Sequence, residues 1–193
     1  MTKRLYLTQQ EVISLLDATS GKRHHVRDKS MILLGFLHGL RVSELTGLTL
    51  EDVDIHAGRL CIRRLKNGLS TIHPLQPVAR ELLAQWLPIR NTYSRKENNW
   101  LFLSAMGNRL SRQRFYTLIR NYARISGIPD YTHPHMLRHA CGYELAEQGM
   151  DTRLIQDYLG HRNIRHTLHY TAANAARFSR VWNNSPLLLR NTG

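Results

Sequence analysis

Apolar runs along the chain are bounded by residues that typically begin or end a helix. Residues 8–11 read Thr-Gln-Gln-Glu, a capping box at the start of an apolar segment. Pro77 suits a first helical turn, and glycine follows several other apolar runs, where a helix can end in a left-handed conformation. The pattern predicts helices over residues 8–18, 28–38, 42–46, from 77 onward, 111–126, 134–148, 151–159 and 174–182.

One pair of segments alternates instead between apolar and polar residues. These segments, 59–65 and 69–73, lie on either side of Lys66-Asn67-Gly68. Asn-Gly between alternating segments is a strong hairpin signal, so we expect Lys66 at the hairpin tip. The pattern also predicts a brief strand over 100–103 and loops over 22–27 and 94–99. The predicted fold class is α+β, mainly helical with one small antiparallel sheet.

Length and composition favour one globular domain. The chain has 193 residues, 42% of them hydrophobic, enough to bury a core and to exclude a disordered basic tail. No apolar run approaches the roughly 20 residues of a membrane span, and the N-terminal residues lack the apolar stretch of a signal peptide. Two cysteines, Cys61 and Cys141, are too few for a disulfide framework. We therefore expect one domain over 1–193, in a reducing cytoplasm and without a membrane partner.

The charge points to a class of partner. Basic residues outnumber acidic ones by 27 to 14, a formal net charge of +13. Of the basic residues 22 are Arg and 5 are Lys, and Arg is favoured where phosphate is held by planar, bidentate contacts. The excess is spread over both halves of the chain, so a binding face must be built by the fold. Nucleic acid is the leading partner, and a generic basic protein is the alternative.

Two motifs hold arginine where an anion is readily bound. His135 and Arg138 share one face at the start of a predicted helix, next to free backbone N–H groups. Arg41 comes soon after Gly39, which is expected to end a helix. The alternative is that these are solvated surface residues, in which case Glu44 would be the partner of Arg41.

A third motif is the His-rich segment 159–171. It contains His161, Arg162 and Arg165, and it ends with Tyr170 in polar surroundings. A tyrosine in such a place is more often an amphipathic residue at the edge of a core, and that alternative stays open.

Together these motifs resemble the tyrosine recombinase (phage integrase) family. The matching pieces, in chain order, are Gly-Leu-Arg41-x-Ser-Glu-Leu, Lys66 on the hairpin, His135-x-x-Arg138-His139, Leu-Gly-His161 and Tyr170. Their order and spacing are more specific than any single motif, and the resemblance spans nearly the whole chain. Within the family, residues 63–68, 132–143 and 154–167 are most similar to short bacterial recombinases that invert fimbrial promoters.

The resemblance implies DNA strand transfer through a covalent intermediate. Tyr170 would attack a backbone phosphorus, form a 3′-phosphotyrosyl link and release a 5′-hydroxyl. Arg41 and Arg138 would hold the non-bridging oxygens of the transition state, and His161 would add a hydrogen bond. We also expect the clustered guanidinium groups to lower the pKa of Tyr170.

The resemblance assigns the proton transfers to two further residues. Lys66 would protonate the leaving 5′-oxygen, and His135 would act as general base or proton relay for Tyr170. No cofactor is expected, neither a metal nor ATP. Rejoining needs no ATP because the bond energy is stored on the enzyme, and the sparse, scattered acidic residues argue against two-metal nuclease chemistry. A metal site is the alternative for His135 and His139, which have the spacing of two zinc ligands on a helix but lack the glutamate of the zinc-protease motif.

The resemblance also implies partners. We expect the protein to bind double-stranded DNA with inverted repeats and to form a homo-tetramer on that DNA. Accessory DNA-bending proteins would be further partners. Four arginines are candidates for contacts to the duplex: Arg112, Arg114, Arg162 and Arg165.

Two features differ from many members of the family. So few residues precede the first predicted core helix that we expect no separate N-terminal core-binding domain. Residues 174–193 would either be exchanged between protomers or pack on their own domain. The predicted function is inversion of a promoter segment that controls fimbrial phase variation. The alternatives are a non-catalytic DNA-binding regulator with this fold, and an integrase or resolvase.

Overall fold

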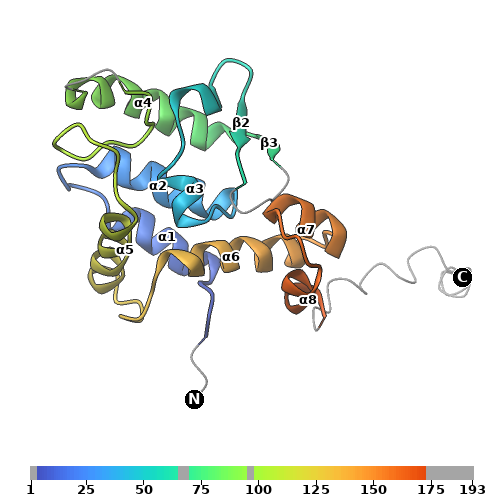
Figure 1. Ribbon diagram of the computed structural model, residues 1–193. Helices are drawn as coiled ribbons and strands as arrows, with labels where there is room; N and C mark the ends of the chain where they lie inside the picture. The colour runs from blue at the N-terminus through green and yellow to red at the C-terminus, as the bar shows by residue number, and fades with distance from the viewer. Residues whose placement is uncertain (1–3, 65–69, 95–97, 173–193) are drawn as a thin grey trace, which may run out of the picture.

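The computed structural model describes residues 4–64, 70–94 and 98–172. Eight α-helices lie within these residues (Figure 1): α1 (Gln9–Asp17), α2 (His25–Leu37), α3 (Val42–Leu45), α4 (Pro77–Tyr93), α5 (Arg112–Ile125), α6 (Pro134–Glu147), α7 (Thr152–Leu159) and α8 (Arg165–Thr171).

Three short strands and a 3₁₀ turn complete the described fold: β1 (Val53–Asp54), β2 (Arg59–Ile62), β3 (Thr71–Pro74) and the turn Leu50–Asp52. The predicted α+β class is therefore confirmed.

The sheet is antiparallel, with the strand order β1-β2-β3. Leu60 lies opposite His73 and Ile62 opposite Thr71, so the predicted hairpin is confirmed. The first strand, β1, was not predicted, because two residues carry no alternating pattern. Residues 65–69, which include Lys66, lie outside the described residues.

The strand predicted over 100–103 is wrong. Trp100 and Leu103 each form only an isolated bridge, to Thr49 and Arg109 respectively. These bridges connect loops rather than extend the sheet.

Most helix ends follow the predicted caps. Thr8 forms the capping box with Glu11, and Ser111 and Asp151 cap α5 and α7 (Thr152–Leu159) with their side chains. One start was wrong: α2 begins at His25, inside the segment predicted as a loop.

The start of α2 moves because its first turn is buried. Arg27 and Asp28 form a buried ion pair there, with Nη2–Oδ1 at 2.7 Å, and Arg27 also donates to the carbonyl of Leu103 at 2.9 Å. Buried charges of this kind are satisfied by their partners and leave no apolar signal in the sequence.

The last described helix, α8, was not predicted at all. Only Thr167, Tyr170 and Thr171 are buried on it, so its sequence lacks an apolar face. The helix predicted over 174–182 and the exchange predicted for 174–193 fall outside the described residues.

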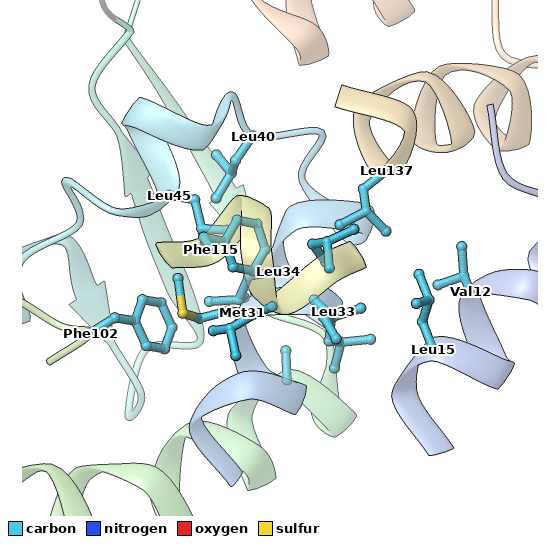
Figure 2. Close-up of a cluster of buried hydrophobic side chains, with 14 of the residues drawn as sticks. Val12, Leu15, Met31, Leu33, Leu34, Leu40, Leu45, Phe102, Phe115 and Leu137 are labelled. Carbon is cyan, nitrogen blue, oxygen red and sulfur yellow. The ribbon is translucent and has the colours of Figure 1, made fainter. Parts of the chain in front are cut away.

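The main hydrophobic core surrounds α2, which packs against α1, α3, α4 and α6. Figure 2 shows side chains of α1, α2, α3, α5 and α6 in one cluster, with Met31 and Leu34 of α2 near its centre. A second, smaller cluster joins α6, α7 and α8 and contains Cys141, Leu159 and Tyr170. In the part of the chain that the structure describes, none of the helices has the length and apolar character needed to cross a membrane.

Candidate active site

Arg41 stands directly before α3, where the chain has just left α2. Its Nη1 lies 2.7 Å from Oε1 of Glu44, and its backbone N–H donates to Oε2 of the same carboxylate at 2.9 Å. The Arg41 side chain is 33% exposed, whereas the Glu44 side chain is 1% exposed. A buried carboxylate therefore orients Arg41 while leaving it open to a phosphate.

Glu44 also pairs with a second arginine, Arg64, whose side chain is fully buried. Nη1 of Arg64 donates to Oε2 of Glu44 at 2.9 Å, and Nη2 donates to the carbonyl of Tyr158. Burial tends to raise the pKa of Glu44, but Arg64 and Arg41 outweigh burial and bring that pKa below its usual value. The carboxylate is thus ionised between two guanidinium groups.

The end of α7 packs closely on Arg64. Gly160 ends the helix with φ +65°, and a Cβ at this position would lie 2.6 Å from Nε of Arg64. Glycine is required both by the left-handed backbone conformation and by the close approach of Arg64. The turn at Gly160 places the following residue, His161, beside the arginines.

Arg138 lies near the start of α6 with its side chain buried. Nη1 donates to the carbonyl of Gly39 after α2, and Nη2 donates to the carbonyl of Leu159 at the end of α7, the latter at 2.7 Å. Burial, and then Arg41 and Arg64, lower the pKa of Arg138 to about 10, so it stays charged at neutral pH. This guanidinium ties three segments together at one point.

Tyr170 lies on α8 and is 2% exposed. Its hydroxyl oxygen is 2.9 Å from Nδ1 of His139 on α6. The ring centroid lies 5.1 Å from that of Tyr143, edge-on, and 3.8 Å from that of His169. A Cβ on Gly142 would come within 2.5 to 2.7 Å of three ring carbons, so the absence of a side chain there makes room for the phenol.

The predicted lowering of the Tyr170 pKa is wrong for this structure. Burial raises the pKa of Tyr170 above its ordinary value of 10, and the opposing effect of Arg138 is smaller. The guanidinium of Arg138 does act on Tyr170, but the prediction left out the loss of solvent around the phenol.

His161 follows α7 and lies beside Tyr170, with the two rings stacked at 6.4 Å between centroids. Its Nδ1 is 2.9 Å from Oγ1 of Thr167. Burial, followed by Arg138 and Arg41, lowers the pKa of His161 to about 3, so the ring is neutral at pH 7. A neutral imidazole that accepts from Thr167 at Nδ1 carries its proton on Nε2 and can donate it.

His135 is exposed in the first turn of α6. Burial of part of its ring, and then Arg138, lower its pKa. Its ring meets that of His139 edge to face at 4.5 Å. The imidazole in contact with the Tyr170 hydroxyl is thus His139, and the role predicted for His135 stays a prediction.

Five of the six predicted catalytic residues converge in space. Arg41 and Arg138 both lower the pKa values of His135 and His161, and Arg138 acts on Tyr170 as well. These residues come from α6, α8 and the segments next to α3 and α7; Figure 1 shows α7 and α8 together at one end of α6 and α3 above it. The arrangement offers two cations, a neutral hydrogen-bond donor and a hydroxyl to one anion.

The other predicted site residues fall into two groups. Lys66 lies outside the described residues. The four arginines predicted to contact DNA are all exposed, but they separate into two pairs: Arg162 and Arg165 lie near His161, while Arg112 and Arg114 lie at the start of α5, at the far side of the molecule in Figure 1.

A metal site finds no support in the described residues. Nowhere in them do three His, Cys, Asp or Glu side chains gather closely enough to hold a metal ion. His135 and His139 form a ring contact with each other instead.

Known proteins are similar to this chain in sequence and in fold. The family model described as "Phage integrase family" matches residues 5–177. The type 1 fimbriae regulatory protein FimE of Escherichia coli strain K12 is 52% identical over 97% of this chain and 96% of its own length, and FimB of the same strain is 50% identical over 95% and 92%. The chain belongs to the phage integrase family.

Solved structures agree with this assignment. The crystal structure of XerA recombinase superposes with a TM-score of 0.80 at 26% identity, over 95% of this chain. The chain spans 65% of that longer protein. The predicted resemblance is therefore confirmed in sequence and in fold.

Three residues that shape the site of this phage integrase family member are not predicted from the sequence. Arg64 and Gly142 lie within the stretches that resemble the family, and His139 is part of one motif and a metal candidate, but the sequence predicts no role in the site for any of them. A glycine in the interior of a helix was the one available signal, because helices disfavour it unless something packs against it.

Proposed function

We propose that this protein cleaves and rejoins DNA through a 3′-phosphotyrosyl intermediate and inverts a promoter segment between short inverted repeats, which controls fimbrial phase variation. Membership of the phage integrase family makes it a site-specific DNA recombinase. The convergence of Arg41, Arg138, His161 and Tyr170 carries the chemical part of the proposal. Identity of 52% to FimE, over almost the full length of both chains, supports the fimbrial part.

Cleavage begins when the Tyr170 oxygen attacks a backbone phosphorus. The Oη–P bond forms as the bond from phosphorus to the 5′-oxygen breaks, and the energy of the bond stays on the enzyme. Arg41 and Arg138 neutralise the charge that builds on the non-bridging oxygens. His161 donates to the same oxygens from Nε2.

Proton transfer completes the cycle. Lys66 gives its proton to the leaving 5′-oxygen, a task for which lysine is better suited than arginine because arginine does not give up its proton at neutral pH. His135, exposed beside the site, relays protons between Tyr170 and solvent. Rejoining reverses each step and needs neither metal nor ATP.

The DNA partner is a duplex with inverted repeats, bound by a homo-tetramer with the help of DNA-bending proteins. Residues 1–193 act as one catalytic domain, and 174–193 are exchanged between protomers. Arg162 and Arg165 contact phosphates next to the scissile one, and Arg112 and Arg114 contact the duplex farther away.

A nicked suicide substrate tests the chemistry directly. Duplexes carrying candidate repeats with a nick next to the cleavage position trap the covalent intermediate, which is detected as a shifted band on a denaturing gel. Wild-type protein should form the adduct in EDTA and without ATP, and Tyr170→Phe should form none. Tyr143→Phe is the matched control. It also removes a phenolic hydroxyl from a ring that packs on Tyr170, but it leaves the Tyr170 hydroxyl in place.

The outcomes separate the competing functions. An adduct with Tyr170→Phe would overturn the assignment of the nucleophile. Specific binding without any adduct would favour a non-catalytic regulator. A plasmid carrying a promoter between inverted repeats then distinguishes inversion from integration or resolution, because only inversion reverses the promoter without changing plasmid size. Binding should also weaken steeply with salt, as phosphate contacts require.

A further inference from the structure

His139 occupies a place that the mechanism above leaves unused. It lies on α6 one turn after His135, and its Nδ1 is 2.9 Å from the Tyr170 hydroxyl. That separation is within the range expected of a base and the proton it removes. His135, whose ring lies 4.5 Å from that of His139, stands on the solvent side.

We propose that His139 is the general base that takes the proton from Tyr170 during DNA cleavage, and that His135 passes this proton on to solvent. This inference rests on the proposed function, since it needs Tyr170 to be the nucleophile. It adds a catalytic residue, because His139 contacts the attacking atom itself.

The surroundings of the phenol fix its direction. Gly142 lets the ring lie against α6, and Tyr143 closes one side of it edge-on at 5.1 Å. In the proposed step this hydroxyl donates to Nδ1 of His139, which requires that the proton of the imidazole is on Nε2. The lone pair at Nδ1 is therefore directed at the hydroxyl before any substrate is bound.

The charges around His139 keep it neutral in the free protein. Burial, and then the neighbouring His135, His169, Arg138 and His133, lower its pKa to about 4. The groups that act on it from α6 and from α8 are all neutral or cationic, and each disfavours a second proton.

A bound DNA phosphate changes this balance. Its negative charge, placed between the arginines and Tyr170, offsets the cations and favours the imidazolium form of His139. The base therefore becomes stronger when the scissile phosphate is present. Proton removal is coupled in this way to correct binding of DNA.

The step balances in atoms and charge. The Tyr170 oxygen bonds to phosphorus as the bond to the 5′-oxygen breaks, and the phenolic proton moves to Nδ1 of His139. The 5′-oxygen takes its proton from the general acid assigned above to Lys66. In rejoining, His139 returns a proton to the Tyr170 oxygen as that oxygen leaves phosphorus.

The decisive variant is His139→Asn, whose side-chain oxygen can replace Nδ1 as an acceptor but cannot be protonated. Single-turnover adduct formation is measured on the suicide substrate between pH 5.5 and 9. Relative to wild type at pH 7, the variant should lose about 10²-fold or more in rate, the usual contribution of a general base. Its rate should then rise with pH, because hydroxide must remove the proton. Tyr143→Phe is the control, because its ring also packs on Tyr170 and it does not act on the pKa of His139, so it should keep the wild-type pH profile.

Chemical rescue separates a base from a packing residue. His139→Ala should be slow and should regain adduct formation when imidazole is added, with a rate that follows the concentration of neutral imidazole. Wild-type rates and pH profile in His139→Asn, or a loss that neither pH nor imidazole relieves, would overturn the proposal. Absence of any adduct with the wild-type protein would instead reject the proposed function, so the two failures are distinguishable.

Discussion

The two sides of the candidate site are held by different means. The cation side, made of Arg41, Glu44, Arg64 and Arg138, is fixed by buried ion pairs and by hydrogen bonds to carbonyls at the ends of α2 and α7. The nucleophile side, made of His139, Gly142, His161 and Tyr170, depends on ring contacts and on the small cluster around α8.

This difference separates two tasks of the site. Preorganised cations stabilise a transition state best when they do not move during the reaction, and the cation side is built into the main core. Tyr170 is 2% exposed, so its hydroxyl reaches a phosphate only when the packing around α8 adjusts. A small cluster on a seven-residue helix allows that adjustment at little cost in free energy.

The largest effect should come from breaking the cation side at Glu44. Glu44→Gln leaves Arg64 as a buried guanidinium without its carboxylate, which typically costs about 3–5 kcal/mol in the free energy of unfolding. Urea unfolding measures this loss. Asp157→Asn is the control, because it removes an exposed i,i+4 partner of Arg153 and should cost less than about 1 kcal/mol. Equal losses in the two variants would show that the buried ion pairs of the cation side stabilise the fold no more than an exposed ion pair does.

Arg138→Lys tests whether geometry matters on the cation side beyond charge. Lysine keeps the positive charge but cannot donate to the carbonyls of Gly39 and Leu159 and to a phosphate at once. We expect adduct formation to slow by about 10²–10³-fold, as when one transition-state donor is lost. Arg124→Lys, on the exposed surface in the last turn of α5, should stay close to wild type in the same single-turnover assay. An unchanged rate in Arg138→Lys would mean that charge alone is enough.

The same contrast explains what could be predicted from the sequence. The hairpin, the helix caps and the residues that converge were predictable, because capping boxes, Asn-Gly turns and motif spacing are local signals. The ion pair of Arg64 with Glu44 joins residues 20 apart in the chain, and nothing local marks it. The nucleophile side was least predictable, since the raised pKa of Tyr170 depends on how α8 packs against α6.

Gly142→Ala is aimed at the nucleophile side. The new methyl group would lie within 2.7 Å of the Tyr170 ring, so the phenol must move away from His139. Overpacking of this kind usually costs about 1–3 kcal/mol in the free energy of unfolding, and adduct formation should fall with it. Gly35→Ala is a matched control in the main core, because it also lies in a helix and its Cβ would meet Leu137 at an ordinary 3.4 Å. If both variants behaved alike, the nucleophile side would not be the more sensitive one.

The smallest effect concerns acid pH, which acts on His38, a buried histidine near Arg64 of the cation side, and on His139 of the nucleophile side. Burial, and then His73 and Arg64, lower the pKa of His38 to about 3, and burial first lowers that of His139 to about 4. As the pH falls below about 6.5, the unfolded chain binds protons at these positions and the folded chain does not, so stability is lost on acidification.

The size of that loss should differ between the two sides. At pH 5.5, one pH unit below the pKa of His38 in the unfolded chain, the fully buried His38 accounts for a loss of up to about 1.4 kcal/mol in the free energy of unfolding. His38→Gln should remove this part of the dependence of that free energy on pH. His139→Asn should flatten the slope less, because His139 is only partly buried and solvent screens its charge. A larger flattening from His139→Asn would mean that the nucleophile side excludes water as firmly as the main core does, and the contrast between the two sides would then rest on packing alone.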